Sequence, residues 1–390
     1  MIASGGYQAF EGAWGPRARL AWDTLAGRPT DGIPAWMVHV MDIPLMEEWT
    51  GRAEGDYARD PDGVYLQFQE QAGACFIDQY LSRNPLTMGQ HGFEASARRG
   101  ATTGAEQIVL DGMAIESPED VVEHMERFVF PRRERQVRSY PSDQAGRAQR
   151  LIDAEVALQT RFGPGLLKGP YSDFQELPRL GYGQYGYVNY LSAYALYPEV
   201  MEQDFRTQAD LAALYNADAA RAIVEGGLPR MVRLDHDMAD SRGTLVNVAS
   251  LDRIWFPHFA RAVQPFLDAG VRLIWHCDGN LMQMVPRLLE AGMGGFQDFQ
   301  YEDGMDYERI CRMTDRDGGP LLIKAGVSVT RTLPFGSRQD VIDEMKWLVE
   351  HGPPRGLFLG ASSSIVPGTS RENIRTLIEG LHHYREHGRG

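Results

Sequence analysis

Eight short apolar segments, each followed by a stretch with helical spacing, constrain the fold of this 390-residue chain more than any other feature. Each segment has the length of a β-strand, and polar residues or glycines lead from it into the next helical pattern. Eight such strand–helix units predict a (β/α)8 TIM barrel. The predicted strands are residues 34–40, 74–78, 165–171, 231–237, 272–278, 294–300, 321–327 and 356–362.

The same pattern indicates one domain that spans residues 1–390. Residues 1–33 are an N-terminal extension, and residues 79–164 form a helical insertion near the barrel mouth, with an extra strand at 106–110. No internal repeat and no Pro/Gly-rich linker divides the sequence into two halves. Apolar residues at three- and four-residue spacing predict helices most clearly at 198–227, 337–352 and 370–384.

Composition excludes several classes of protein. The net charge of −14 argues against nucleic acid or anionic membranes as partners. No apolar run reaches the ~20 residues that span a bilayer, and the N-terminus lacks a signal-peptide core. Three cysteines without a CxxC pair indicate neither a disulfide framework nor a thiolate-rich zinc site, so we expect a cytoplasmic protein.

Polar residues follow the predicted strands at the end where α/β barrels place their active sites. Because side chains alternate along a strand, His276 and Asp278 share one face and Cys277 points the other way. His276 and Asp278 form either a metal site or a hydrogen-bonded pair that orients an organic substrate. Asp235 and Asp237 form either an acid–base pair or a solvated turn, and His39 is a further catalytic candidate. The other polar residues at these strand ends are Asp78, His236, Gln300, Tyr301, Glu302, Ser328 and Ser362–Ser364.

The C-terminal half resembles the uroporphyrinogen decarboxylase superfamily in the segments RLIWHCDGN (272–280), GVSVTRTLPFGSRQD (326–340) and GLFLGASSSIVPGTSRENI (356–374). That superfamily holds the haem-pathway decarboxylase and zinc-dependent methyltransferases that exchange methyl groups with corrinoid proteins. Their zinc is bound by a His-x-Cys-Gly motif, where His276 matches the histidine and Asp278 replaces the cysteine.

The resemblance implies zinc or another divalent metal on His276 and Asp278. The family's third ligand, a cysteine after the eighth strand, is missing, because this chain has Ser362–Ser364 there. Glu302 is the substitute carboxylate, and Asp235 or Asp237 are others.

The decarboxylase branch fits less well. Its motif after the first strand carries arginines that bind substrate carboxylates, whereas this chain has His39 and Ile43 at those positions. Serines replace its late Gly-His-Gly turn. A cavity rich in carboxylates would also repel a polycarboxylated tetrapyrrole, so the resemblance favours the methyltransferase branch.

Five residues are candidate substrate contacts. Tyrosines in the stretch 181–197 either stack on a flat ligand, such as a corrinoid, or form a lid or interface. We expect few cations near the cavity, namely Lys168, Arg233 and Arg331. The candidate contacts are Trp36, Tyr185, Tyr187, Gln300 and Ser363.

The leading hypothesis is a methyltransferase or demethylase that moves a methyl group between a small substrate and a corrinoid protein. The chain has no Asp-x-His-x-x-Gly motif, so the corrinoid is expected on a separate partner. One alternative is a lyase or decarboxylase that acts on a small carboxylated or aromatic compound by Asp/His acid–base chemistry. Another is a non-catalytic barrel that binds a tetrapyrrole or corrinoid. The oligomeric state stays open, with a homodimer as one option.

Overall fold

The computed structural model describes residues 6–83, 108–141 and 143–390. A strand lies within or next to each of the eight predicted segments, so this part of the prediction is confirmed. The strands of the main sheet are β1 (Ala35–Trp36), β2 (Ala74–Ile77), β5 (Leu167–Lys168), β6 (Met231–Asp235), β9 (Arg272–His276), β10 (Met293–Gln297), β11 (Leu322–Val327) and β12 (Leu357–Ala361). Two antiparallel hairpins, β3 (Val109–Leu110) with β4 (Met113–Ala114) and β7 (Ala239–Asp240) with β8 (Gly243–Thr244), lie outside it.

The eight strands form one parallel sheet in the order β5-β2-β1-β12-β11-β10-β9-β6. This is the strand order of a (β/α)8 barrel, because the last strand, β12, pairs in parallel with the first, β1. The described residues contain no backbone ladder between β5 and β6. The eight-stranded parallel α/β sheet is therefore confirmed, whereas a closed hydrogen-bonded barrel is not.

Side chains bridge the seam between β5 and β6. β5 is short, and Gly169 and Pro170 follow it; a proline cannot donate to a ladder. The Tyr171 hydroxyl donates to Asp235 Oδ2 over 2.8 Å. From β6, Arg233 Nε donates to Asp78 Oδ2 over 2.6 Å, and the guanidinium lies over the Tyr171 ring. Side-chain bonds thus join strands that the backbone leaves unpaired.

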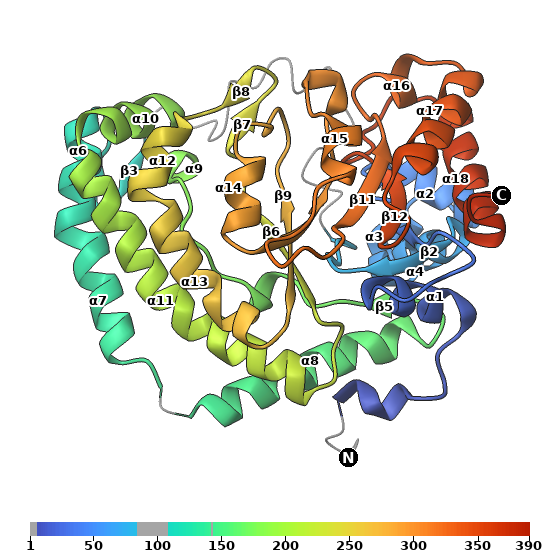
Figure 1. Ribbon diagram of the computed structural model, residues 1–390, viewed down its shortest axis with the longest axis horizontal. Coiled ribbons are helices and arrows are strands. Elements are labelled where there is room, and N and C mark those ends of the chain that lie inside the picture. The colour runs from blue at the N-terminus through green and yellow to red at the C-terminus, as the bar shows by residue number, and fades with distance from the viewer. Residues whose placement is uncertain (1–5, 84–107, 142) are drawn as a thin grey trace.

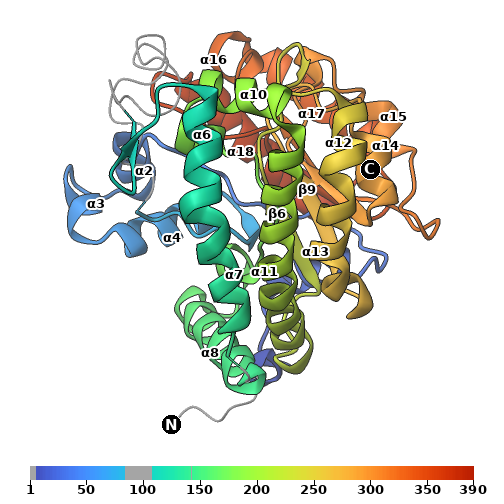
Figure 2. The same ribbon diagram turned by 90° about the vertical axis from the view of Figure 1, so that its left-hand side faces the viewer.

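Helices lie outside the sheet, and α11, α13 and α7 run side by side along one flank (Figures 1 and 2). None of the described helices has the length and apolar character needed to cross a membrane. The longer helices are α1 (Pro16–Leu25), α4 (Pro61–Gln71), α7 (Phe130–Arg138), α8 (Gln144–Phe162), α10 (Tyr187–Leu196), α11 (Pro198–Glu225), α13 (Phe256–Asp268), α17 (Arg338–His351) and α18 (Arg371–His387). The shorter ones are η1 (Gly6–Phe10), α2 (Ile43–Thr50), α3 (Asp56–Arg59), α6 (Pro118–His124), η3 (Met125–Val129), η4 (Ser172–Phe174), α9 (Tyr182–Tyr185), α12 (Val248–Ile254), α14 (Val285–Glu290), η5 (Tyr301–Asp303), α15 (Tyr307–Cys311) and α16 (Thr332–Phe335).

The helix boundaries follow local capping chemistry. The predicted helices at 198–227, 337–352 and 370–384 correspond to α11, α17 and α18. Ser337 and Asp340 form a reciprocal capping box that satisfies the first backbone N–H groups of α17. Ser370 accepts from Asn373 N at the start of α18. These side chains explain why sequence alone located the helix starts.

Two helices of the predicted insertion 79–164, α6 and α7, lie on the flank of the molecule. α6 packs against α10, and α7 packs against α11 (Figure 2). α8 packs against β5 and α11, as a crossover helix between β2 and β5 does. Residues 84–107 lie outside the described residues, and with them part of the predicted strand 106–110; β3 corresponds to its last two positions.

Aromatic side chains fill the sheet interior around Trp36. Its ring meets Phe76 and Phe358 edge to face, with centroids 4.7 and 5.1 Å apart. The indole N–H donates to Asp78 Oδ1 over 2.8 Å, and the side chain is fully buried. Trp36 was predicted to contact substrate; it is a core residue, because β1 directs it into the sheet interior.

We expect Lys168→Met to lower the free energy of unfolding by about 3–5 kcal/mol, measured by denaturant unfolding. Lys168 Nζ lies 3.1 Å from Glu155 Oε1, and both side chains are buried. Removing the lysine leaves a buried carboxyl without its cation. The double variant Lys168→Met/Glu155→Leu should recover most of the loss; a double variant as unstable as the single one would contradict this account.

Candidate active site

A cavity of about 230 Å³ lies where the sheet strands end at their carboxyl side. Five of the predicted site residues line it: His39, Asp235, His276, Asp278 and Ser363. They come from four different strand ends, and parallel strands bring those ends to one side of the sheet. The other lining residues are Met37, Gln79, Arg233, Gln297, Asp298, Lys324 and Ser364.

Asp235, Asp237 and His276 form a group whose ligand-type atoms all lie within 4.8 Å of one another. The register of the sheet brings two of them together, because Asp235 on β6 is the backbone partner of His276 on β9. His276 Nε2 is 3.9 Å from Asp235 Oδ1. Asp237 lies just after β6 and is exposed; its Oδ1 accepts from Asp278 N. One imidazole and two carboxylates can bind a divalent cation.

The charge state of His276 depends on its carboxylate neighbours. Burial lowers the pKa of His276, but Asp235 and Asp278 outweigh burial and raise the pKa above its usual value. Burial raises the pKa of Asp235, but His276 and Arg233 outweigh it and hold that pKa below its usual value. The two side chains therefore favour each other's charged forms when no cation occupies the group.

Asp278 lies in the same cavity and carries a proton more readily than an ordinary aspartate. Burial raises its pKa to about 6, against the opposing effect of His276. Its Oδ1 is buried without a hydrogen-bond partner among the described residues. Asp278 can therefore exchange a proton with a ligand near neutral pH.

Two buried cations lie among the carboxylates. Arg233 donates to Asp235 Oδ2 over 3.0 Å and to Gln79 Oε1 over 2.8 Å, besides its bond to Asp78. Lys324 donates to Asp298 and to the carbonyl oxygen of Ala361. The sequence-based expectation of few cations near the cavity was incomplete, since it missed Lys324 within the strand 321–327.

The other two expected cations lie elsewhere. Lys168 pairs with Glu155 beneath β5. Arg331 donates to the carbonyl oxygen of Glu302 and lies 3.9 Å from Asp303. Neither lines the cavity, because the first points toward α8 and the second belongs to the loop after β11.

Four polar atoms of cavity residues are buried and have no hydrogen-bond partner among the described residues. His39 Nδ1 bonds to Ser364 Oγ over 2.9 Å, which leaves Nε2 without a partner. Burial, followed by Arg233 and Lys324, lowers the pKa of His39 to about 4, so this imidazole is neutral at physiological pH. Buried polar groups normally have partners, so their gathering indicates a polar ligand. The atoms are His39 Nε2, His276 Nδ1, Asp278 Oδ1 and Gln297 Oε1.

Glu302 does not join this group, although it was predicted as a metal ligand. Its Oε1 accepts from Ser328 Oγ and Thr330 Oγ1, both over 2.5 Å. It is not among the residues that line the cavity. η5 turns the chain directly after β10, so the carboxylate faces the loop after β11.

The three other predicted substrate contacts, Gln300, Tyr187 and Tyr185, do not line the cavity. Gln300 Oε1 accepts from Gly279 N and so fixes the turn after His276. Tyr187 stacks on Tyr182 with ring centroids 4.5 Å apart. Tyr185 is buried and bonds to His124, so it is a structural residue of the flank.

His236 and Cys277 also have structural roles. His236 Nε2 accepts from Leu180 N over 2.8 Å, and burial lowers its pKa to about 3. Cys277 Sγ accepts from Met238 N over 3.2 Å. Neither residue lines the cavity, which follows from strand alternation.

No known family model matches the chain, and no curated protein matches it in sequence. Among solved structures, a methyltransferase from Methanosarcina mazei is similar in fold, with a TM-score of 0.56 at 16% sequence identity. The similarity covers 94% of this chain and 98% of that one. The two chains therefore share a methyltransferase-like α/β fold over nearly their whole length.

Glu344 provides a pH-dependent test of the loop beside the site. Its Oε1 accepts from Ser328 N over 2.6 Å, and burial raises its pKa to about 7. The folded protein thus keeps a proton that the unfolded chain loses near pH 4.5, so stability from this group falls as pH rises toward 7. We expect Glu344→Gln to add about 1–2 kcal/mol at pH 8 and little at pH 5, measured by unfolding at both values. An equal change at both pH values would contradict the shift.

Proposed function

We propose that this protein is a methyltransferase of the uroporphyrinogen decarboxylase superfamily that acts on a small polar substrate. The observation that carries the proposal is the group of Asp235, Asp237 and His276 beside the cavity, at the carboxyl ends of the strands. Active sites of barrel enzymes lie at this end. The methyltransferase-like fold supports the reaction class.

The donor atoms suit a divalent metal. Asp235 uses Oδ2 for Tyr171 and Arg233, which leaves Oδ1 toward His276. On the other side of the imidazole, His276 Nδ1 lies 3.7 Å from Asp298 Oδ2. At that distance Asp298 attracts a proton on Nδ1 without hydrogen-bonding to it, so Nε2, which faces Asp235, is the nitrogen that would bind the ion. We therefore propose Asp235, Asp237 and His276 as ligands for zinc or a harder divalent ion, in place of the sequence-predicted set with Asp278 and Glu302.

The bound ion would act as a Lewis acid on the heteroatom that carries the methyl group. Asp278 would give its proton to that heteroatom as the methyl group leaves, which its pKa near neutrality favours. Gln79, Gln297 and Ser363 would orient the substrate from the remaining walls.

The size of the cavity bears on the substrate. Pockets for drug-sized ligands hold about 300–1,000 Å³, whereas this one holds about 230 Å³. A tetrapyrrole is larger than the space, so a small methylated compound is the better fit. The methyl acceptor or donor would then be a corrinoid carried to the mouth by a separate protein.

Metal binding is the first test. We expect chelator-treated protein to gain thermal stability on addition of Zn²⁺ or Mn²⁺, by about 2.7 kcal/mol when free metal is ~100-fold above its Kd. His276→Ala and Asp237→Asn should lose this shift and bind less metal by elemental analysis. Glu302→Gln is the matched control and should keep both. Equal loss in the control, or no shift in the wild type, would contradict the ligand set.

The reaction is the second test. Reduced cobalamin, as a surrogate for the corrinoid protein, is mixed with the enzyme and separate pools of methyl ethers, methylamines and methyl thioethers. Transfer to Co(I) changes the visible spectrum to that of methylcobalamin. We expect one pool to react, and His276→Ala to lower the rate by about 100-fold or more. Cys277→Ser, on the same strand but outside the cavity, should keep the rate. No conversion with any pool by folded, metal-loaded enzyme would refute the proposal.

A further inference from the structure

A second hollow lies at the opposite end of the sheet, where the strands begin. It holds about 420 Å³ and is bordered by the end of α1, the turn from α11 to β6, and the start of β9. We call it the arginine hollow, after Arg230 and Arg272 on its wall. Its apolar wall includes Trp22, Leu25, Leu228 and Pro229.

The charge of the arginine hollow is entirely positive. No acidic side chain lines it, and among the described residues neither guanidinium forms an ion pair with a carboxylate. This is unusual for a chain with a net charge of −14. Burial lowers the pKa of Arg272, and Asp315 opposes that effect only in part. A guanidinium that has lost water and has no carboxylate in direct contact favours the arrival of an anion.

The two arginines are held in place by the backbone. Arg230 O accepts from Arg272 N over 3.0 Å, which fixes the spacing of the two residues. Gly294 makes room for the Arg272 side chain, because a Cβ there would lie 2.9 Å from Arg272 Cγ. The guanidinium of Arg272 therefore extends from a packed stem.

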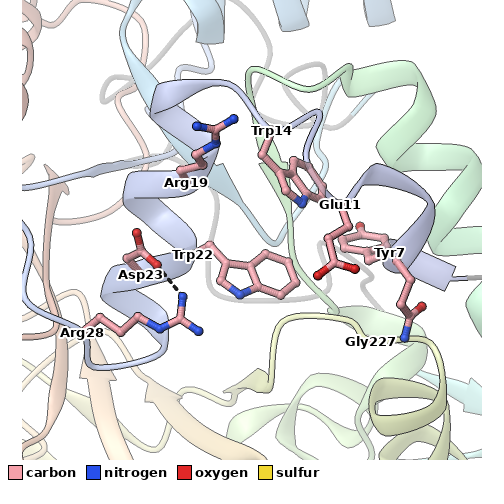
Figure 3. A pocket seen from close by; sticks show the side chains of 9 residues that line it. Tyr7, Glu11, Trp14, Arg19, Trp22, Asp23, Arg28 and Gly227 are labelled. Carbon is pink, nitrogen blue, oxygen red and sulfur yellow. Dashed lines mark hydrogen bonds and ion pairs between the residues drawn. The ribbon is translucent and has the colours of Figure 1, made fainter.

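The hollow next to the arginine hollow is lined by equal numbers of acidic and basic side chains (Figure 3). Trp22 and Gly227 border both hollows. In Figure 3, Asp23 pairs with Arg28, with 2.7 Å between Oδ1 and Nη1. Glu11 and Arg19 line the same hollow. Its two acids and two bases cancel, so of these two hollows the arginine hollow alone has an excess of positive charge.

We propose that the arginine hollow binds a small organic anion, with a carboxylate or phosphate on the two guanidinium groups and a flat apolar body against Trp22 and Leu25. This site is distinct from the catalytic cavity. Arg272 begins β9 and His276 ends it, so the two sites lie at opposite ends of one strand.

Calorimetric titration of the full-length protein at low salt tests the site, with benzoate and phenyl phosphate as probes. We expect both to bind, and Arg230→Gln and Arg272→Gln each to weaken binding by about tenfold. Arg19→Gln, from the balanced hollow, is the matched control and should change affinity by less than about twofold. His276→Ala should also leave binding unchanged, which separates this site from the catalytic cavity.

Three results would overturn the proposal: no binding to the wild type, equal weakening by Arg19→Gln, or inorganic phosphate binding as tightly as phenyl phosphate. The last would mean that the apolar wall contributes nothing. Benzyl alcohol, which keeps the ring and lacks the charge, should not bind. If Arg272→Gln does not fold, Arg230→Gln and the salt dependence decide, since affinity must fall as salt rises.

Discussion

The buried guanidinium of Arg233 is the interaction on which the site depends. It is 2% exposed and donates to Asp78, Gln79 and Asp235, so one side chain links β2 and β6 across the seam. Burial raises the pKa of Asp78, but Arg233 outweighs it and keeps that carboxyl ionised. The same cation holds Asp235 as an anion that faces His276. Without it, Asp78 would be buried with no cation beside it, and Asp235 would lose one of the two cations that hold its pKa down.

The fold could largely be predicted from sequence because each strand and helix carries its own local signal. The apolar runs that became β6, β9, β11 and β12 end at polar residues, and serine caps mark α17 and α18. The missing hydrogen-bond ladder between β5 and β6 could not be predicted from the sequence. Whether the sheet closes into a barrel depends on how these two strands, which are far apart in the sequence, meet in space. Pro170 is the one sequence sign that the strand stops early.

The candidate site was predicted in part for a similar reason. Strand alternation placed His276 and Asp278 on one face, and both line the cavity. Strand alternation could not decide which carboxylate is the third metal ligand. Asp237 and Glu302 both follow the ends of their strands, where alternation no longer describes the path of the chain. Lys324 was missed although a lysine inside an apolar strand is itself a signal. Its partner Asp298 directly follows the neighbouring strand β10 and has a left-handed φ of 59°, which strand alternation does not describe.

The unpaired seam between β5 and β6 allows one edge of the active site to move more easily than the other. β6 is joined to β9 by a ladder of backbone hydrogen bonds. Within the part of the chain that the structure describes, no such ladder joins β6 to β5, and Tyr171 and the Arg233 guanidinium bridge the gap with side-chain contacts. Side-chain bonds can exchange partners with a ligand, whereas a ladder must break as a unit. The strand that carries Asp235 can therefore adjust toward a bound ion or substrate along one edge while its other edge stays anchored.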